Sequence, residues 1–74
     1  MSNGDDEYRT AIKEILAELG KTERDIKHYK KAGMYEMRAF TAGKQLGFIE
    51  ALEFLRIPRE SISLALELGD QKPF

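Results

Sequence analysis

Side chains suited to a helix seam recur in the first third of the chain at alternating spacings of four and three residues. These positions are Tyr8, Ile12, Ile15, Leu19, Thr22, Ile26 and Tyr29. The heptad-type spacing predicts one side of a helix that packs lengthwise on another helix. We expect one helix from about Asp5 to about Ala32, closed by Gly33 in a left-handed conformation.

Gly20 leaves a second interpretation open, in which this segment forms two helices. Thr22 and Asp25 would then cap the second helix in the manner of a capping box. A glycine costs about 1 kcal/mol in a helix interior. The heptad phase nevertheless continues through Gly20 without a break, so we favour one helix.

The second predicted helix, from about Tyr35 to Arg56, is apolar around nearly its whole circumference. Residues 46–55 contain only two charged side chains, Glu50 and Glu53. A helix that is apolar on all sides has to be buried on all sides, which a single partner helix cannot achieve. The expected core of the two helices consists of Ile12, Ile15, Leu19, Ile26, Leu46, Ile49, Leu52 and Leu55.

The chain is too short to be stable by a large core alone. A domain of this size buries only about 60% of the surface that its unfolded chain exposes. Because the chain has no cysteine, disulfides and cysteine-based zinc sites are excluded as supports. A single histidine also argues against a histidine-based metal site within one chain. We therefore predict an all-α fold, a long antiparallel helical hairpin plus a short C-terminal helix, that assembles into an oligomeric helical bundle.

Small residues four apart in the second helix mark the expected contact between subunits, because they let another helix approach closely. The predicted oligomer interface consists of Phe40, Gly43, Gly47, Phe48, Ala51 and Phe54.

The segment after Pro58 is ambiguous. Ile62, Leu64, Leu66 and Leu68 alternate with other residues, which is typical of a strand. Proline at a first helical position and an acidic residue in the first turn favour a short helix over residues 59–69 instead. We expect a single domain over residues 1–74, with flexible ends at residues 1–4 and 70–74.

The middle of the chain is basic, although the formal net charge of the whole is −1. The basic residues gather near the predicted turn, where they could hold a nucleotide or nucleic acid. Lysines at a helix C-terminus also complement the helix dipole, which is the simpler interpretation. The candidate anion-binding residues are Lys27, Lys30, Lys31 and Arg38 for charge, with Tyr29 and Tyr35 for stacking.

Patterns that carry catalysis are missing from the sequence. We find no glycine-rich phosphate loop, nucleophile elbow or metal-binding motif, and His28 is the only histidine. We therefore predict no catalytic residue, no metal site, no cofactor and no enzymatic activity. The acidic N-terminus is unlike a signal peptide, and no apolar run approaches the ~20 residues of a membrane span. A soluble, cytoplasmic protein without membrane contact is expected.

Residues 31–36, Lys-Ala-Gly-Met-Tyr-Glu, and residues 42–53 form a tyrosine-containing turn followed by a Gly-x-x-x-Gly-x-x-x-Ala-Leu helix. This stretch resembles small helical-hairpin proteins encoded by phages and mobile elements. The resemblance implies an oligomer that binds a host or phage protein, or one that sequesters a nucleotide signal.

Our leading hypothesis is a non-enzymatic homo-oligomer that acts as a protein-interaction or regulatory module, such as an accessory or inhibitory factor. Its partners would be itself and another protein. The alternative hypothesis is an anion-binding protein that holds a nucleotide or nucleic acid at the basic hairpin end.

Overall fold

The computed structural model describes residues 3–71, which form three helices. They are α1 (Asn3–Lys31), α2 (Tyr35–Phe54) and α3 (Arg59–Gln71). The predicted all-helical class is confirmed, as are a single helix across Gly20 and a helix after Pro58. The flexible ends stay a prediction: residues 3–4 belong to α1 and residues 70–71 to α3, whereas residues 1–2 and 72–74 lie outside the described residues.

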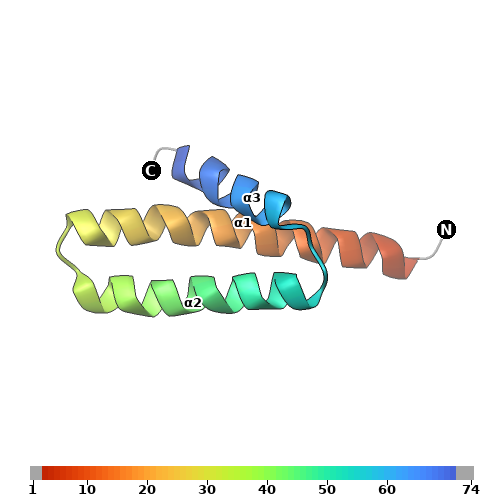
Figure 1. Cartoon of the computed structure of the whole chain (residues 1–74), viewed down its shortest axis with the longest axis horizontal. Coiled ribbons are helices and arrows are strands. Elements are labelled where there is room, and N and C mark those ends of the chain that lie inside the picture. The colour runs from red at the N-terminus through yellow and green to blue at the C-terminus, as the bar shows by residue number, and fades with distance from the viewer. Residues whose placement is uncertain (1–2, 72–74) are drawn as a thin grey trace.

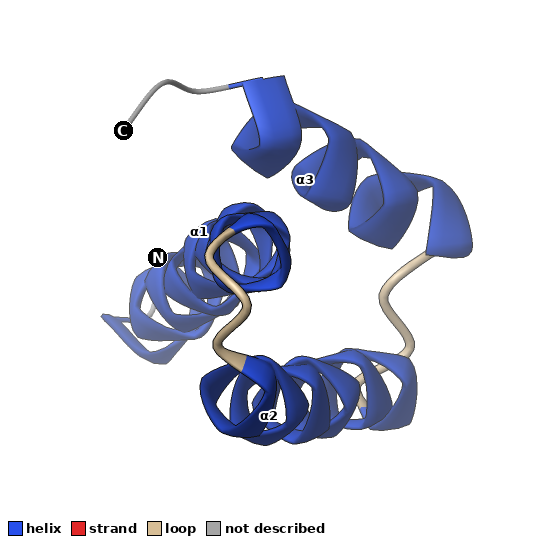
Figure 2. Ribbon diagram, turned by 90° about the vertical axis from the view of Figure 1, so that its left-hand side faces the viewer, coloured by secondary structure: helices blue, strands red, loops and turns tan. Residues whose placement is uncertain are grey.

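The long helix α1 is the centre of the molecule. Figure 1 shows the chain running along α1, turning, and returning beside it as α2. Seen from the end, α2 and α3 take different positions around α1 (Figure 2). Each of them contacts α1 extensively but the other only slightly. The resulting molecule is elongated, measuring 49 × 23 × 20 Å.

The buried apolar core is small and takes one side chain from each helix. Among the described residues these are Leu19, Leu52 and Ile62. The prediction that Leu19 and Leu52 belong to the core is confirmed. The prediction for Leu46 is wrong, because its side chain is 57% exposed. The other five residues of the expected core are only half-buried.

Polar groups connect α1 and α2 next to this core. The Thr22 hydroxyl is buried and donates a hydrogen bond of 2.6 Å to the Leu19 carbonyl within α1. From α2, the Gln45 side-chain amide donates to the Thr22 hydroxyl at 3.3 Å and to a Glu23 carboxylate oxygen at 3.4 Å. Because these partners lie on different helices, they favour one register of α2 along α1.

Both α1 and α2 end in a left-handed residue. Gly33 has φ +72°, as the sequence predicted, and Arg56 has φ 65°. The following amides donate back into the last turn of each helix, Met34 to Tyr29 at 2.9 Å and Ile57 to Leu52 at 3.0 Å. This is the Schellman arrangement. A residue with a Cβ loses about 1–2 kcal/mol in the left-handed conformation. Arg56 therefore lowers the local stability at the end of α2, and contacts elsewhere in the fold have to offset this loss.

The helices α1 and α3 meet through two buried glycines, Gly20 and Gly69. A Cβ on Gly20 would lie 2.8 Å from the Ala65 carbonyl oxygen and 3.1 Å from the Gly69 Cα. A Cβ on Gly69 would overlap the backbone of Gly20. The two backbones are therefore in direct contact, and Gly20 belongs to a second contact side of α1 that the heptad did not reveal.

We expect Gly69→Ala to lower the free energy of unfolding by about 1–3 kcal/mol, the usual cost of overpacking. The loss should occur although alanine is the better helix former. Urea unfolding followed by circular dichroism measures it. Ser63→Ala, at an exposed site of the same helix, is the matched control and should be neutral or slightly stabilising. A Gly69→Ala protein as stable as the wild type would contradict this packing.

An ion pair also joins α1 and α3, between Lys27 Nζ and Asp70 Oδ2 at 2.6 Å. The hydrogen bond to Asp70 raises the pKa of Lys27 above its ordinary value of 10.5. A raised folded-state pKa means that the pair stabilises the fold fully below pH 10.5 and stops doing so as pH rises through the raised value.

We therefore expect Lys27→Gln to lower the unfolding temperature slightly at pH 7–10, and the difference from the wild type to vanish at higher pH. Thermal melts of both proteins from pH 7 to above pH 10.5 measure the difference in unfolding temperature. Lys13→Gln, at an exposed position of α1, is the control. A difference that persists unchanged at the alkaline end would exclude the ion pair as its cause.

Candidate functional site

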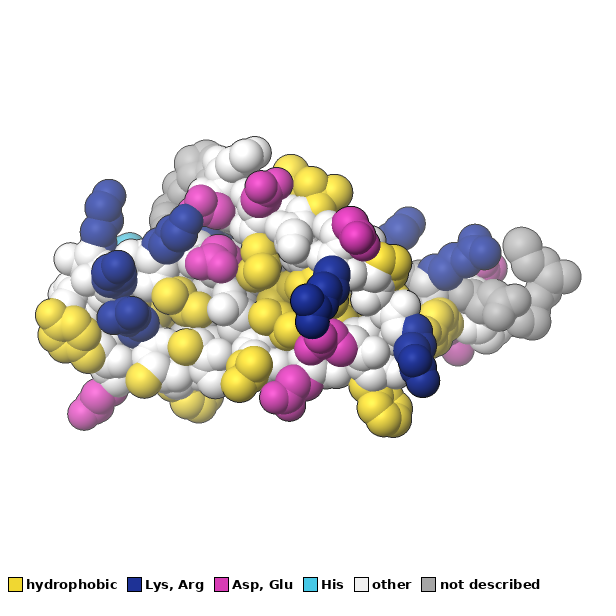
Figure 3. Space-filling view, in the orientation of Figure 1, with side chains coloured by type: hydrophobic (Ala, Val, Ile, Leu, Met, Phe, Trp, Pro, Cys, Tyr) yellow, Lys and Arg dark blue, Asp and Glu magenta, His cyan; other side chains and the backbone are white. Residues whose placement is uncertain are grey.

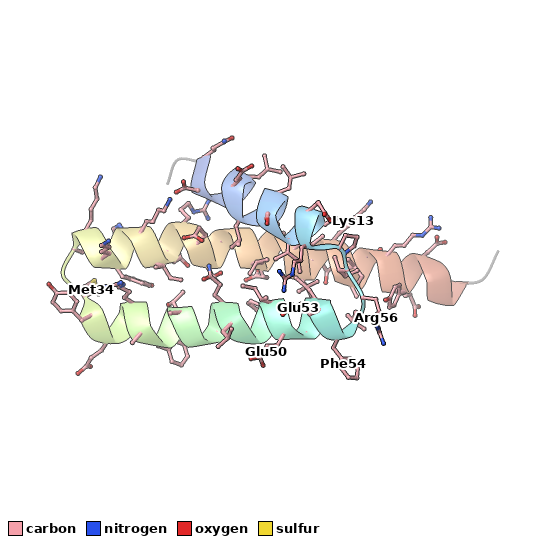
Figure 4. All side chains as sticks on the ribbon, viewed as in Figure 1. Lys13, Met34, Glu50, Glu53, Phe54 and Arg56 are labelled. Atoms are coloured by element: carbon pink, nitrogen blue, oxygen red, sulfur yellow. The ribbon has the colours of Figure 1, made fainter. Side chains whose placement is uncertain are left out.

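One side of α2 faces away from the rest of the molecule and presents apolar groups. We call it the α2 outer face and define it by Phe40, Gly43, Gly47, Ala51 and Phe54, all exposed. Phe40 is 72% exposed and Phe54 is 85% exposed. Figure 4 shows Glu50 and Phe54 pointing away from α1, and Figure 3 shows apolar side chains along the edge of the molecule formed by α2.

The two glycines make the centre of this face flat and open. A Cβ added at Gly43 or at Gly47 would have no neighbouring atom within 4 Å. These glycines therefore have no packing role inside the chain, in contrast to Gly20 and Gly69. In a helix interior, each also costs stability relative to alanine. A second helix packed closely on this face would explain why both positions are glycines.

Five of the six residues predicted for the interface share the outer face, and Phe48 is the exception. Its side chain is half-buried and packs against the core. Sequence reasoning also missed Leu46, which it had placed in the core and which adds exposed apolar surface to α2. The error arises because the nearly uniform apolar pattern of α2 does not say which side meets α1.

Two charged side chains flank the outer face. Lys44 precedes Gly47 by three residues and Glu50 follows it by three. At about 100° per residue they lie on opposite edges of the apolar stripe. Lys44 Nζ lies 5.8 Å from the centre of the Phe48 ring, within the range of a cation–π interaction. The stripe is thus bordered by a base on one edge and an acid on the other.

The candidate anion-binding residues are less well assembled. Lys27 is engaged by Asp70 of α3. Tyr29 is half-buried, with its ring 5.7 Å from the ring of His28, whereas Tyr35 is 71% exposed. Lys30 and Lys31 are exposed and Arg38 is half-buried. Lysine and arginine side chains do gather at the turn end of the molecule (Figure 3). Within residues 3–71, however, no hydrogen bond or ion pair joins the side chain of one of these six residues to that of another.

A groove of about 540 Å³ lies between α1 and α3, which sequence reasoning did not identify. Leu16 and Ala17 line it from α1, and the half-exposed Leu64 and Leu68 line it from α3. None of the candidate anion-binding residues lines it. The sequence feature that could have indicated this groove is the spacing of Leu64 and Leu68, which are four residues apart. We could not use it because the same segment also resembled a strand.

Two further observations bear on chemistry. Within residues 3–71, no group of three or more His, Asp or Glu side chains is placed to hold a metal ion. None of the three helices is both long and apolar enough to cross a membrane.

Comparison with known proteins does not assign the chain to a family. No protein-family model matches the chain, no curated protein matches it, and no solved structure matches it. The resemblance to helical-hairpin proteins of phages and mobile elements is therefore not supported by a match. The function has to be argued from the geometry of the three helices.

Proposed function

We propose that this protein is a non-enzymatic, oligomeric helical protein that acts as a protein-interaction or regulatory module through the α2 outer face. The observation that carries the proposal is the exposure of Phe40 and Phe54 at the two ends of an open track of small residues. An exposed contiguous apolar surface on a small protein is typical of a contact site.

The free energy of burial supports a partner at this face. Burying a phenylalanine side chain contributes about 1.5–3 kcal/mol, and aromatic residues are enriched where proteins bind each other. The track between the two rings lets a helix come close without side chains in the way. The face therefore combines aromatic anchors with a flat centre, which suits a helix better than a small ligand.

The small internal core supports the same proposal. Within residues 3–71 three apolar side chains are buried, one from each helix, which is few for a domain of this length. Chains of this size commonly obtain further stability from a partner subunit. We propose that the antiparallel hairpin of α1 and α2 is the building unit, that α3 holds to α1, and that α2 contributes to a bundle shared between chains.

The alternative is an anion-binding protein, and the observation that favours it is the exposure of Lys30, Lys31 and Tyr35 near the turn. Nucleic-acid binding of this kind weakens steeply with salt because counterions are released. Burial of the α2 outer face should respond much less to salt. The dispersed placement of the candidate residues makes this the second choice.

We expect Gly47→Leu to abolish association while it keeps or raises helicity. Inside one chain the new side chain meets nothing, and leucine improves helix propensity by up to about 1 kcal/mol. At a close helix contact the same bulk would separate the partners. Native mass spectrometry of protein purified from cells, together with circular dichroism, measures both effects.

Glu14→Leu is the matched control, since it adds the same side chain at an exposed position of α1. It should leave the wild-type complex intact, whether that complex contains a second copy or a different protein. Gly47→Leu that keeps the wild-type complex and native helicity would contradict a role for the α2 outer face.

A further inference from the structure

We infer that the turn between α1 and α2 docks on an anionic lipid surface, where its lysines meet phosphate headgroups and its apolar side chains enter the layer beneath them. We call this site the turn tip and define it by Lys30, Lys31, Met34, Tyr35 and Met37. It lies at one extreme of the long axis of the molecule (Figure 1). The inference goes beyond the proposed function, because the turn tip is separate from the α2 outer face and takes a different kind of partner.

Three large side chains with apolar surface are exposed within four residues at the turn tip. Met34 is 45% exposed, Tyr35 is 71% exposed and Met37 is 43% exposed, and Figure 4 shows Met34 at the turn. Side chains of an α-helix tilt toward its N-terminus, so Tyr35 and Met37, in the first turn of α2, lean toward the end of the molecule. The tip therefore presents apolar surface where it can enter a lipid layer without the rest of the chain.

Met34 is a poor choice for the stability of the helix that it precedes. It is the N-cap residue of α2, and no side chain at this cap bonds to the first amides of the helix. Serine, threonine, aspartate and asparagine are preferred at an N-cap because their side-chain oxygens accept such a hydrogen bond. The exposed methionine thus stabilises neither the core nor the helix end, whereas a lipid layer would bury it.

Basic side chains accompany these apolar groups. Lys30 and Lys31 are exposed in the last turn of α1, and Figure 3 shows basic and apolar side chains together at this end of the molecule. Residues 27–38 contain four Lys or Arg and one Glu, so their formal charge is 4 − 1 = +3. It is still 3 − 1 = +2 when Asp70, which pairs with Lys27, is counted. Lysine side chains are long enough to keep their ammonium groups among the headgroups while neighbouring apolar groups lie deeper.

The two ends of the molecule differ in charge, which would direct the turn tip to an anionic surface. At the opposite end, residues 3–14 of α1 contain two Lys or Arg and four Asp or Glu, so their formal charge is 2 − 4 = −2. The molecule is 49 Å long, whereas the field of an anionic membrane decays within a Debye length of ~8 Å in physiological salt. The field therefore acts on the nearer end and attracts the basic one.

A lipid surface fits the turn tip better than a nucleotide or a nucleic acid does. A nucleotide is held by groups that converge on one phosphate, and no hydrogen bond or ion pair within residues 3–71 joins the side chains of the tip. A lipid surface offers many phosphates, so separate lysines can each meet a different one. The exposed methionines gain nothing from a sugar-phosphate backbone, whereas apolar groups gain free energy in a lipid layer, and tyrosine is enriched at the membrane–water interface.

The expectation of no membrane contact depended on the absence of a spanning segment. A contact at the surface does not need such a segment, because only side chains at the tip enter the layer.

Co-sedimentation of the full chain with lipid vesicles tests the inference. The vesicles consist of phosphatidylcholine alone, or of phosphatidylcholine and phosphatidylserine mixed two to one. We expect binding to the mixed vesicles that weakens as salt is raised, and little binding to phosphatidylcholine alone. The double variant Lys30→Gln, Lys31→Gln should bind the mixed vesicles about 25-fold more weakly, about fivefold for each lysine. The double variant Lys13→Gln, Lys21→Gln removes the same charge from exposed positions of α1 away from the turn, and it should bind as the wild type does.

Met34→Ser separates insertion from folding. A serine at the N-cap can accept a hydrogen bond from the first amides of α2, so we expect helicity and unfolding temperature at or above those of the wild type. Binding to the mixed vesicles should nevertheless fall about tenfold, because a large apolar group is lost. Leu64→Ser, at an exposed position of α3, is the control and should bind as the wild type does. Unchanged binding of Met34→Ser would overturn the insertion of apolar groups.

Tryptophan fluorescence shows which end of the molecule enters the layer, because the chain has no native tryptophan. Tyr35→Trp gives a reporter at the turn tip, and Tyr8→Trp gives one at an exposed position toward the other end of α1. We expect the emission of Tyr35→Trp to shift to shorter wavelength on the mixed vesicles and that of Tyr8→Trp to stay unchanged. A shift of the Tyr8→Trp emission alone would assign the contact to the wrong end.

Three further results would overturn the inference. A wild-type chain that binds neither kind of vesicle, or both equally, has no site for an anionic lipid surface. An equal loss of binding in the two double lysine variants would show that net charge governs binding and that the turn tip does not. An oligonucleotide that binds the chain under conditions in which the mixed vesicles do not would assign the basic residues to nucleic acid instead.

Discussion

The contact between Gly20 in α1 and Gly69 in α3 decides where every other surface of this protein lies. Neither residue has a side chain, so the two helix backbones touch directly, and the Ala65 carbonyl closes the space beside Gly20. This contact holds α3 on α1, with the ion pair of Lys27 and Asp70 nearby. Since α3 is held on α1, it covers little of α2.

An exposed α2 is the main consequence of this arrangement. A helix that is apolar on most sides contacts one neighbour and leaves the opposite side in water. A move of α3 onto α2 would relieve the unfavourable exposure of Phe40 and Phe54 inside one chain. Such a move would break the backbone contact at Gly20 and separate Ile62 from the small core. A partner bound at the α2 outer face would relieve the same exposure without any rearrangement of the chain.

The two glycine pairs illustrate how the same residue type serves two purposes. Gly20 and Gly69 are buried against other backbone, and a Cβ there meets atoms at once. Gly43 and Gly47 stand in open space and are a conformational cost to the isolated helix. The first pair explains the fold of one chain. The second pair makes structural sense when another helix lies against it, which is why the proposed function centres on Gly47.

The sequence by itself predicted α1 and α2, their approximate ends and the seam of α1, and it favoured a helix over a strand for α3. These follow from local periodicity, from Gly33 at a left-handed helix end and from Pro58 at the start of α3, all of which act over a few residues. It also indicated the five residues of the α2 outer face through their spacing. It did not determine that Leu46 faces outward, that Phe48 packs inward or that Arg56 takes a left-handed conformation.

Only the tertiary structure decided which side of α2 meets α1 and where α3 lies. The side of α2 depends on contacts such as that of Gln45 with Thr22 and Glu23, between residues far apart in the chain. The position of α3 depends on a glycine in each of two distant helices, and neither glycine carries a pattern that points to the other. A hydrophobic pattern records how much of a helix is to be buried, whereas the partner that buries each side is set by shape and close approach in three dimensions.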